Sequence, residues 1–341
     1  MPPITVSGLN RAAEQYEPTL RKLPFLVLMD VLSEMQINLK EVTYKDTLIQ
    51  FERKAGSSKP YAAGTIDYTS EIGKMIERSL IVLPCYNAIK EHIQNYAAVA
   101  VLNPTGDKIN NQTKKHPLEK EILEALVRTI GEDILDSIFH GTRNTADKSP
   151  LGMLDGYFTQ IATEIAAGTI ATAHGNYATS GTLPVPSSDS YAFDRLYTWI
   201  RKAHPQLRKK AAALYISPSA LINAKDALSY LLGINRLDAF DRFLPYLRQV
   251  ADAPNLEIIS TDALGSGSQL VLAKPRLLDL GMNTKTDVQF IQARNPYEDP
   301  NYVQFWSQWE LGARINSLHE KEFFCNEQTN TATDMAGDYV S

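Results

Sequence analysis

The residue types that most often hold metals or carry enzyme chemistry are scattered through this chain. The six histidines include no pair at the i, i+4 spacing that places two metal ligands on one helix face: His92, His116, His140, His174, His204 and His319. Cys85 and Cys325 lie far apart, and neither belongs to a CxxC pair. We therefore expect no metal centre and no cofactor. We also expect both thiols to be reduced, as in a cytoplasmic protein, rather than part of a disulfide framework.

Two further groups of residues have the composition of a catalytic site without its context. Glu132, Asp133 and Asp136 would share one helix, where paired carboxylates can act as acid and base, but a solvated helix face has the same pattern. Residues 264–268, LGSGS, match neither the GxSxG nucleophile elbow nor the GxGxxG and phosphate-loop patterns. The sequence assigns no catalytic residue, and we do not expect an enzyme.

Composition excludes several classes of protein. The 341 residues are 44% hydrophobic and 21% charged, which is enough for one large or two modest domains. The net charge of −5 differs from the basic balance of proteins that grip nucleic acid. No apolar run reaches the roughly 18 residues of a membrane span, so no membrane partner is expected. Residues 1–4 begin no signal-peptide pattern, so none is expected.

The strongest element signal is a long amphipathic helix that begins at Pro117. Proline suits the first helical position, because no N–H bond is needed there. Gly141 stands where a left-handed glycine would end the helix, and the segment SPLGML at residues 149–154 follows a polar loop. The apolar positions recur at helical spacing and form a stripe wide enough to be buried: Leu118, Ile122, Leu123, Leu126, Val127, Ile130, Ile134, Leu135 and Ile138.

The segment before this helix combines helical and extended signals. Pro18 and Pro24 break up the helical signals of residues 1–40. The apolar run at 23–29 predicts either a core helix or an arm that packs on a neighbouring subunit.

Residues 41–84 predict a long hairpin with a polar tip at 53–60, which would bury little of itself. Within it, residues 80–83 suit a short buried strand that Pro84 stops, and residues 86–96 are predicted as a short helix.

The second half of the chain alternates helix and strand and then returns to long strands. Before residue 275 the pattern predicts a mixed sheet with helices on it, with strands at 211–216, 256–260 and 269–273 and helices at 157–165, 193–200 and 218–232. Strands are predicted at 287–293 and 302–316, with 318–324 continuing the second.

These segments, in this order, resemble the major capsid proteins of tailed double-stranded DNA bacteriophages, which have the Hong Kong 97-type fold. The long helix with its Gly/Pro loop carries the resemblance, together with residues 208–221 (RKKAAALYISPSAL) and 256–264 (LEIISTDAL). The resemblance covers roughly residues 40–325 and lies in the pattern of segments, with no chemical fingerprint.

The resemblance implies an α+β capsid fold in several parts. These are an N-terminal arm at 1–40, an extended hairpin loop at 41–84, a peripheral domain at 85–154 and 275–325 with the long spine helix and long strands, an axial domain at 155–274 with a mixed sheet and helices, and a C-terminal tail at 326–341.

The function implied is self-association into pentamers and hexamers that form an icosahedral head, the virion shell, assembled in the host cytoplasm. The chain would be its own main partner. Scaffolding, portal and decoration proteins would be further partners, and double-stranded DNA would be enclosed without sequence-specific binding.

Arg53, Lys54 and Lys59 at the hairpin tip are the candidate subunit-interface residues, although a hairpin kept soluble by charge has the same pattern. Some family members crosslink a hairpin lysine to an asparagine of a neighbour. Lys54, Lys59 and asparagines such as Asn295 and Asn301 are present, but the reaction is not assigned.

Two other classes of protein stay open as alternatives. An encapsulin-type compartment shell has the same fold but holds a cargo enzyme, and the helix-like N-terminal region is compatible with cargo docking. A soluble enzyme with an unrecognised site is the other alternative. The absence of any metal, nucleotide or nucleophile pattern argues against it.

Overall fold

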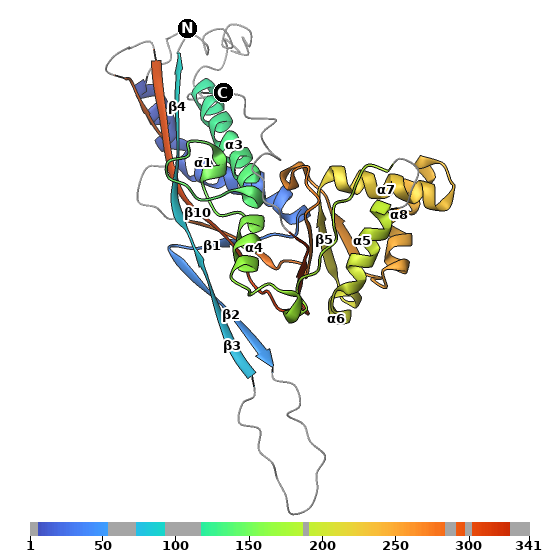
Figure 1. The fold of residues 1–341 in the computed structure, drawn as a ribbon. Helices are drawn as coiled ribbons and strands as arrows, with labels where there is room; N and C mark the ends of the chain where they lie inside the picture. Colours follow the sequence, from blue (N-terminus) through green and yellow to red (C-terminus); the bar gives the residue numbers. More distant parts are fainter. Residues whose placement is uncertain are drawn as a thin grey trace, which may run out of the picture.

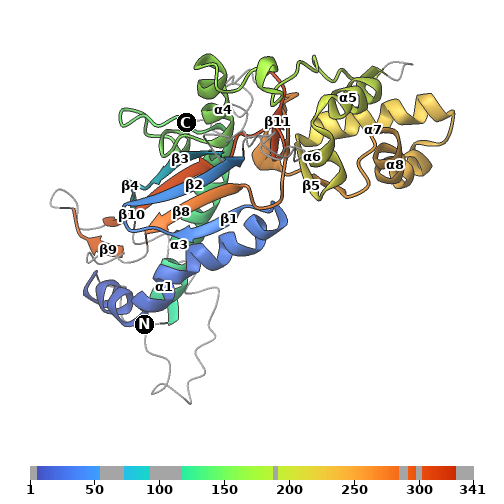
Figure 2. The same cartoon turned by 90° about the horizontal axis from the view of Figure 1, so that it is seen from below.

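The computed structural model describes residues 6–53, 73–92, 117–186, 191–283, 291–296 and 302–327. The chain forms an elongated body, a compact helical lobe and a two-stranded hairpin that projects from the body (Figure 1). In the body, helices α1 (Val6–Glu34) and α3 (Pro117–His140) pack on the same side of one sheet (Figure 2). The lobe packs its helices against a second sheet. This mixture of helices and sheets is the predicted α+β class.

The sheet of the body is built around one long strand, β10 (Tyr302–Ile315). It pairs antiparallel with β4 (Leu83–His92), β8 (Leu278–Asn283) and β9 (Ile291–Arg294). Strand β1 (Asn38–Glu41) extends the sheet by pairing parallel with β8. The predicted alternation of β10 is confirmed, because the buried side chains of one face are Val303, Phe305, Ser307, Trp309 and Leu311.

Strand β4 corrects the prediction of a short helix at 86–96. Residues 86–92 pair instead with β10, so that Tyr86 lies opposite Gln308 and His92 opposite Tyr302. Pro84 does not end the strand either. Since β4 lies at the edge of its sheet, a residue without an N–H is tolerated there.

Helix α3 has the predicted span and the predicted buried face. The side chains of its stripe that are buried are Ile122, Leu123, Leu126, Val127, Ile130, Ile134 and Ile138, and Leu135 packs at the margin. The prediction for Gly141 is wrong, because its backbone is not left-handed. This glycine instead allows close packing: a Cβ there would lie 2.6 Å from the carbonyl oxygens of both Ser137 and Leu154.

Helix α1 runs without interruption through Pro18 and Pro24, so the predicted breaks are wrong. Each proline removes one backbone hydrogen bond. The buried faces of Leu9, Leu20 and Leu28, which pack in the same core as α3, compensate for that loss. The apolar run therefore lies within a helix, and Leu28 near its end is buried in the core with α3. That the segment also packs on a neighbouring subunit stays a prediction.

The second sheet is centred on β5 (Ala212–Ile216). Strand β5 pairs parallel with β6 (Leu256–Ile259) and antiparallel with β7 (Leu270–Ala273), which confirms the three strands predicted here. Strand β11 (Phe323–Cys325) pairs with β7. The end of the chain therefore does not continue β10, as expected for residues 318–324, but crosses to the second sheet.

Both faces of the second sheet are buried, which explains why every residue of β5 is apolar and inaccessible. Ala213 and Tyr215 point into the core of the body, and the Tyr215 hydroxyl donates to the Met35 carbonyl oxygen at 2.8 Å. Leu214 and Ile216 point into the core of the lobe. The second sheet is thus shared between body and lobe.

The helices of the lobe follow from local signals. These helices are α5 (Tyr191–Lys202), α6 (Pro205–Lys209), α7 (Pro218–Leu232) and α8 (Arg236–Val250). The Ser217 hydroxyl accepts a hydrogen bond from the Ala220 N–H at 3.3 Å and so caps α7, which confirms the helix predicted at 218–232. Gly233 ends α7 in the left-handed conformation, with φ 60°.

Candidate functional site

The hairpin of β2 (Lys45–Arg53) and β3 (Gly73–Ile81) is the feature that the rest of the fold presents to solvent. Its register runs antiparallel from Lys45 opposite Ile81 to Arg53 opposite Gly73. The predicted hairpin is confirmed over these strands, and its tip, residues 54–72, lies outside the described residues. A two-stranded ribbon has only marginal stability by itself. Its attachment to the body therefore decides where it points.

Two glycines form the seat on which the hairpin crosses the body. Gly281 of β8 and Gly312 of β10 lie directly opposite each other in the sheet. A Cβ at Gly312 would collide with the carbonyl oxygen of Ile81, and a Cβ at Gly281 would lie 3.1 Å from carbons of both Leu80 and Val82. Only this glycine pair lets β3 pass so close to the sheet.

A small apolar cluster is buried where the hairpin crosses the body, and its members are Val42, Leu48, Leu80 and Val82. All four side chains are at most 5% exposed. Ile81, next to them in sequence, is 44% exposed. The run at 80–83, predicted to be buried throughout, therefore alternates between the body and solvent.

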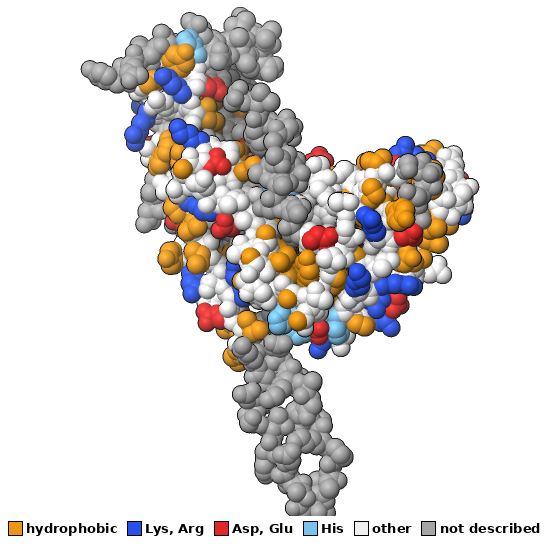
Figure 3. Space-filling view, in the orientation of Figure 1, with side chains coloured by type: hydrophobic (Ala, Val, Ile, Leu, Met, Phe, Trp, Pro, Cys, Tyr) orange, Lys and Arg blue, Asp and Glu red, His pale blue; other side chains and the backbone are white. Residues whose placement is uncertain are grey.

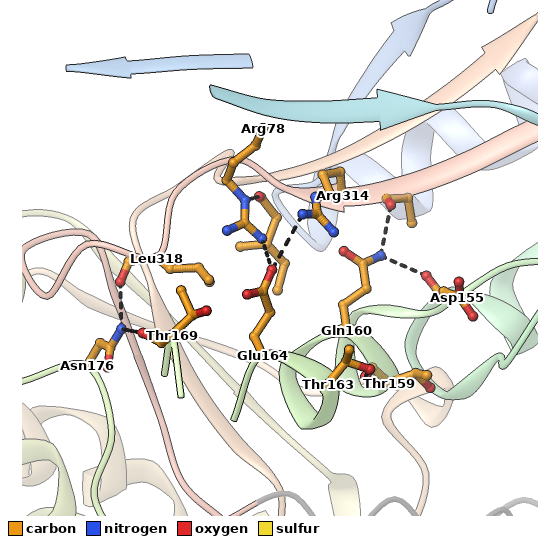
Figure 4. Close-up of polar contacts among 12 residues, drawn as sticks. Arg78, Asp155, Thr159, Gln160, Thr163, Glu164, Thr169, Asn176, Arg314 and Leu318 are labelled. Atoms are coloured by element: carbon orange, nitrogen blue, oxygen red, sulfur yellow. Dashed lines mark hydrogen bonds and ion pairs between the residues drawn. The ribbon is translucent and has the colours of Figure 1, made fainter. Parts of the chain in front are cut away.

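A buried ion cluster fastens the same strand to α4 (Tyr157–Ala166) and β10 (Figure 4). The Arg78 Nη2 lies 2.6 Å from the Glu164 Oε1, and the Arg314 Nη2 lies 3.4 Å from the same oxygen. Arg78 also donates through Nε to the Ile315 carbonyl oxygen at 3.0 Å and is only 8% exposed. One carboxylate thus holds strands β3 and β10 through two guanidinium groups. The pKa of Arg314 is lowered by burial and by the nearby positive charge of Arg78, while Glu164 opposes that shift.

Helix α4 is itself fixed to the body, so the cluster has a rigid base. The Gln160 side-chain amide donates to the carbonyl oxygens of Asp155 at 2.7 Å and Ala313 at 2.8 Å (Figure 4). Asn176, in the segment that follows α4, donates to the Leu318 carbonyl oxygen at 2.9 Å.

The outer face of the hairpin carries three exposed apolar side chains among polar ones such as Lys45 and Glu77. Strand alternation and register place Ile49, Met75 and Ile81 on one face and Leu48, Arg78 and Leu80 on the other. The first three are 67%, 72% and 44% exposed. Figure 3 shows exposed hydrophobic side chains beside the start of the hairpin. An apolar face on an element that projects from the body is typical of a protein–protein contact.

The predicted interface residues lie toward the end of this hairpin. Arg53 is the last residue of β2, opposite Gly73, while Lys54 and Lys59 fall outside the described residues. Their role in an interface stays a prediction. The sequence patterns did not predict where the hairpin crosses the body, although isolated glycines within strand patterns, such as Gly281 and Gly312, are a recognised signal of close backbone approach.

The described His, Cys, Asp and Glu side chains do not come together into a metal site. Among the described residues no group of three or more His, Cys, Asp or Glu side chains could hold a metal ion. Cys85 and Cys325 are free and buried, and burial raises the pKa of both thiols. Burial and the neighbouring charges of Asp136 and Glu132 raise the pKa of Asp133 to about 6. No described helix is long and apolar enough to cross a membrane.

Comparison with known proteins gives matches to structures only. No protein-family model and no curated protein sequence matches the chain. A chain of the satellite phage P4 procapsid, which includes the size determination (Sid) protein, matches with a TM-score of 0.50 at 12% identity, over 89% of this chain and 99% of that one. The capsid of the myovirus phage XM1 matches with a TM-score of 0.48 at 10% identity, over 85% and 89% of the two chains. The capsid of an empty GTA particle matches with a TM-score of 0.48 at 11% identity, over 86% and 88%.

The match to the P4 procapsid chain extends over nearly the whole of both chains, and the elements found here are those expected of a capsid protein: a long central helix, long strands, a projecting hairpin and a separate lobe. The chain has the phage capsid fold.

Proposed function

We propose that this chain is the major capsid protein of a tailed double-stranded DNA phage, and that it assembles through pentamers and hexamers into an icosahedral head. The observation that carries the proposal is the projecting hairpin of a capsid-type fold, with one face fastened to the body and three exposed apolar side chains on the other face. Exposed apolar side chains on a projecting element favour a contact with another surface, and a second copy of the chain supplies that surface.

The same reading assigns the chain no catalytic residue and no cofactor. Its work is binding to itself, and DNA is enclosed by a wall with a net charge of −5 rather than gripped by a basic groove. The division into arm, hairpin, peripheral domain and axial domain belongs to this proposal. So do the virion location and the scaffolding, portal and decoration partners.

Negative-stain microscopy of the purified, overexpressed protein tests the proposal, with size-exclusion chromatography of the same sample. We expect closed shells of genome-sized volume, or rings of five and six subunits where a scaffold is needed to close them. Small shells around a cargo enzyme would replace the proposal with the encapsulin-type alternative. A monomer at every concentration would contradict both and favour a soluble enzyme.

Hydrogen exchange locates the contact. The amides of β2 and β3 should exchange quickly in isolated subunits and slowly after assembly, because a neighbouring copy then covers the hairpin. Equal exchange in the two states would show that the hairpin is not the contact.

A further inference from the structure

A basic pocket of about 520 Å³ lies between the hairpin, α6 and the turns that join the two sheets. Four basic side chains from three separate segments line it: Lys210, Lys274, Arg276 and Lys321. The Glu322 Oε1 lies 3.4 Å from the Lys274 Nζ and neutralises one of these charges. Within the described part of the chain, Lys210, Arg276 and Lys321 form no ion pair. A chain that is acidic overall therefore concentrates unneutralised positive charge beside its projecting hairpin.

Arg276 stands in the pocket at a turn whose backbone conformation would suit a smaller residue. Arg276 has φ 59°, in the left-handed region that favours glycine or asparagine. Its N–H donates to the carbonyl oxygen of Gln36. The backbone of Gln36 is also left-handed, with φ 54°. The side chain of Arg276 is exposed, so no packing explains an arginine at this turn. Strain of this kind is found most often at functional sites.

A complementary group lies elsewhere on the same molecule. Glu132 is exposed on α3, and its neighbour Asp133 lines a separate groove of about 780 Å³ beside β4. Neither forms an ion pair with any described residue. Figure 1 shows α3 in the upper part of the body and α6 at the lower edge of the lobe. The basic and acidic groups of one chain therefore cannot meet, whereas those of two copies can.

We infer that the basic pocket binds the Glu132–Asp133 segment of a second copy of this chain, in a head-to-tail contact between subunits. This inference rests on the proposed function and names one of its contacts. A contact between two different surfaces of identical subunits is heterologous, and such contacts build a closed ring where the rotation between subunits closes. Complementary charge in such a contact mainly sets the rate and the register of association.

Charge reversal and charge swapping test the inference in the full-length chain. The pocket variant is Lys210→Glu with Lys321→Glu, and the helix variant is Glu132→Lys with Asp133→Asn. We expect each to slow assembly, followed by light scattering, by about tenfold in roughly 0.05 M salt, and much less in about 1 M salt, where screening removes the new repulsion. The combination of all four substitutions in one chain should restore most of the rate, because the contact is again between opposite charges.

Two controls separate this contact from folding and from net charge. Arg11→Glu with Arg242→Glu makes the same change in net charge as the pocket variant, at exposed positions outside both groups, and should assemble like the wild type. Arg276→Asn suits the left-handed backbone, so its melting temperature should be unchanged or higher while its assembly slows.

Three results would overturn the inference. The first is a pocket variant that assembles at the wild-type rate in low salt. The second is a chain with all four substitutions that assembles no faster than the pocket variant or the helix variant. The third is a pocket variant that assembles normally but whose shells lose DNA, which would make the pocket a nucleic-acid contact. In each case shells still form, so the proposed function survives. A wild-type chain that forms no shells or rings would instead contradict the proposed function itself.

Discussion

Glu164 neutralises two guanidinium groups at a place where water has little access. Its side chain is 16% exposed, and Arg78 beside it is 8% exposed. Without the carboxylate, Arg78 would keep a buried positive charge with only the Ile315 carbonyl oxygen to accept from it, which is costly.

We expect Glu164→Gln to lower the free energy of unfolding by about 1.5–3 kcal/mol, the range for a hydrogen bond to a charged group. Denaturant titration checks this. The control is Asp226→Asn, which removes the partner of the 63% exposed Arg236 and should lower the free energy of unfolding by less. Equal losses in the two variants would show that the cluster does not anchor the hairpin.

Asp133 makes the stability of the isolated subunit depend on pH. Its pKa is raised to about 6 in the folded chain from an ordinary value of 3.8, so between these values the folded state holds a proton that the unfolded state has lost. That stabilisation is present below about pH 4 and is lost as pH rises through about 6. Asp133→Asn should therefore raise the melting temperature at about pH 8 and leave it nearly unchanged at about pH 4. Asp241→Asn, at an exposed position, serves as the control.

At the scale of elements, α3 carries the fold, and the hairpin is the proposed contact. Ile130 and Ile134 are fully buried at the centre of the helix stripe. Ile134→Ala should lower the free energy of unfolding by about 2–5 kcal/mol, the range for a cavity in a core. Leu135→Ala, at the margin of the same turn, should cost less. The expected product of Ile134→Ala is insoluble or unfolded subunits, and a folded subunit of unchanged melting temperature would show that the buried face is elsewhere.

At the scale of the whole molecule, assembly would repeat the small free energy of one ion pair at every subunit contact. If Arg53, Lys54 and Lys59 meet acidic side chains of a neighbour, each exposed pair is worth at most about 1 kcal/mol, but every contact of a shell repeats it. Lys54→Glu with Lys59→Glu should leave the subunit folded and weaken assembly, more in low salt than in high salt. Light scattering across a salt series measures this, with Arg11→Glu and Arg242→Glu as the control of equal charge. Assembly like that of the wild type in low salt would limit these lysines to keeping the hairpin soluble.

The sequence by itself determined the elements whose signals are local. The stripe of α3, the alternation of β10 and the Ser217 cap of α7 each follow from neighbouring residues, because helical periodicity, strand pleat and capping act over a few positions.

Only the tertiary structure decided the features that depend on distant partners. Residues 86–92 form a strand because β10 offers its edge, and α1 continues through Pro18 and Pro24 because the core with α3 compensates for the lost hydrogen bonds. The glycine seat and the Glu164 cluster join residues far apart in the chain, and no local pattern encodes which of them will meet. The projection of the hairpin, and with it the surface offered to a neighbour, is therefore a property of the folded chain.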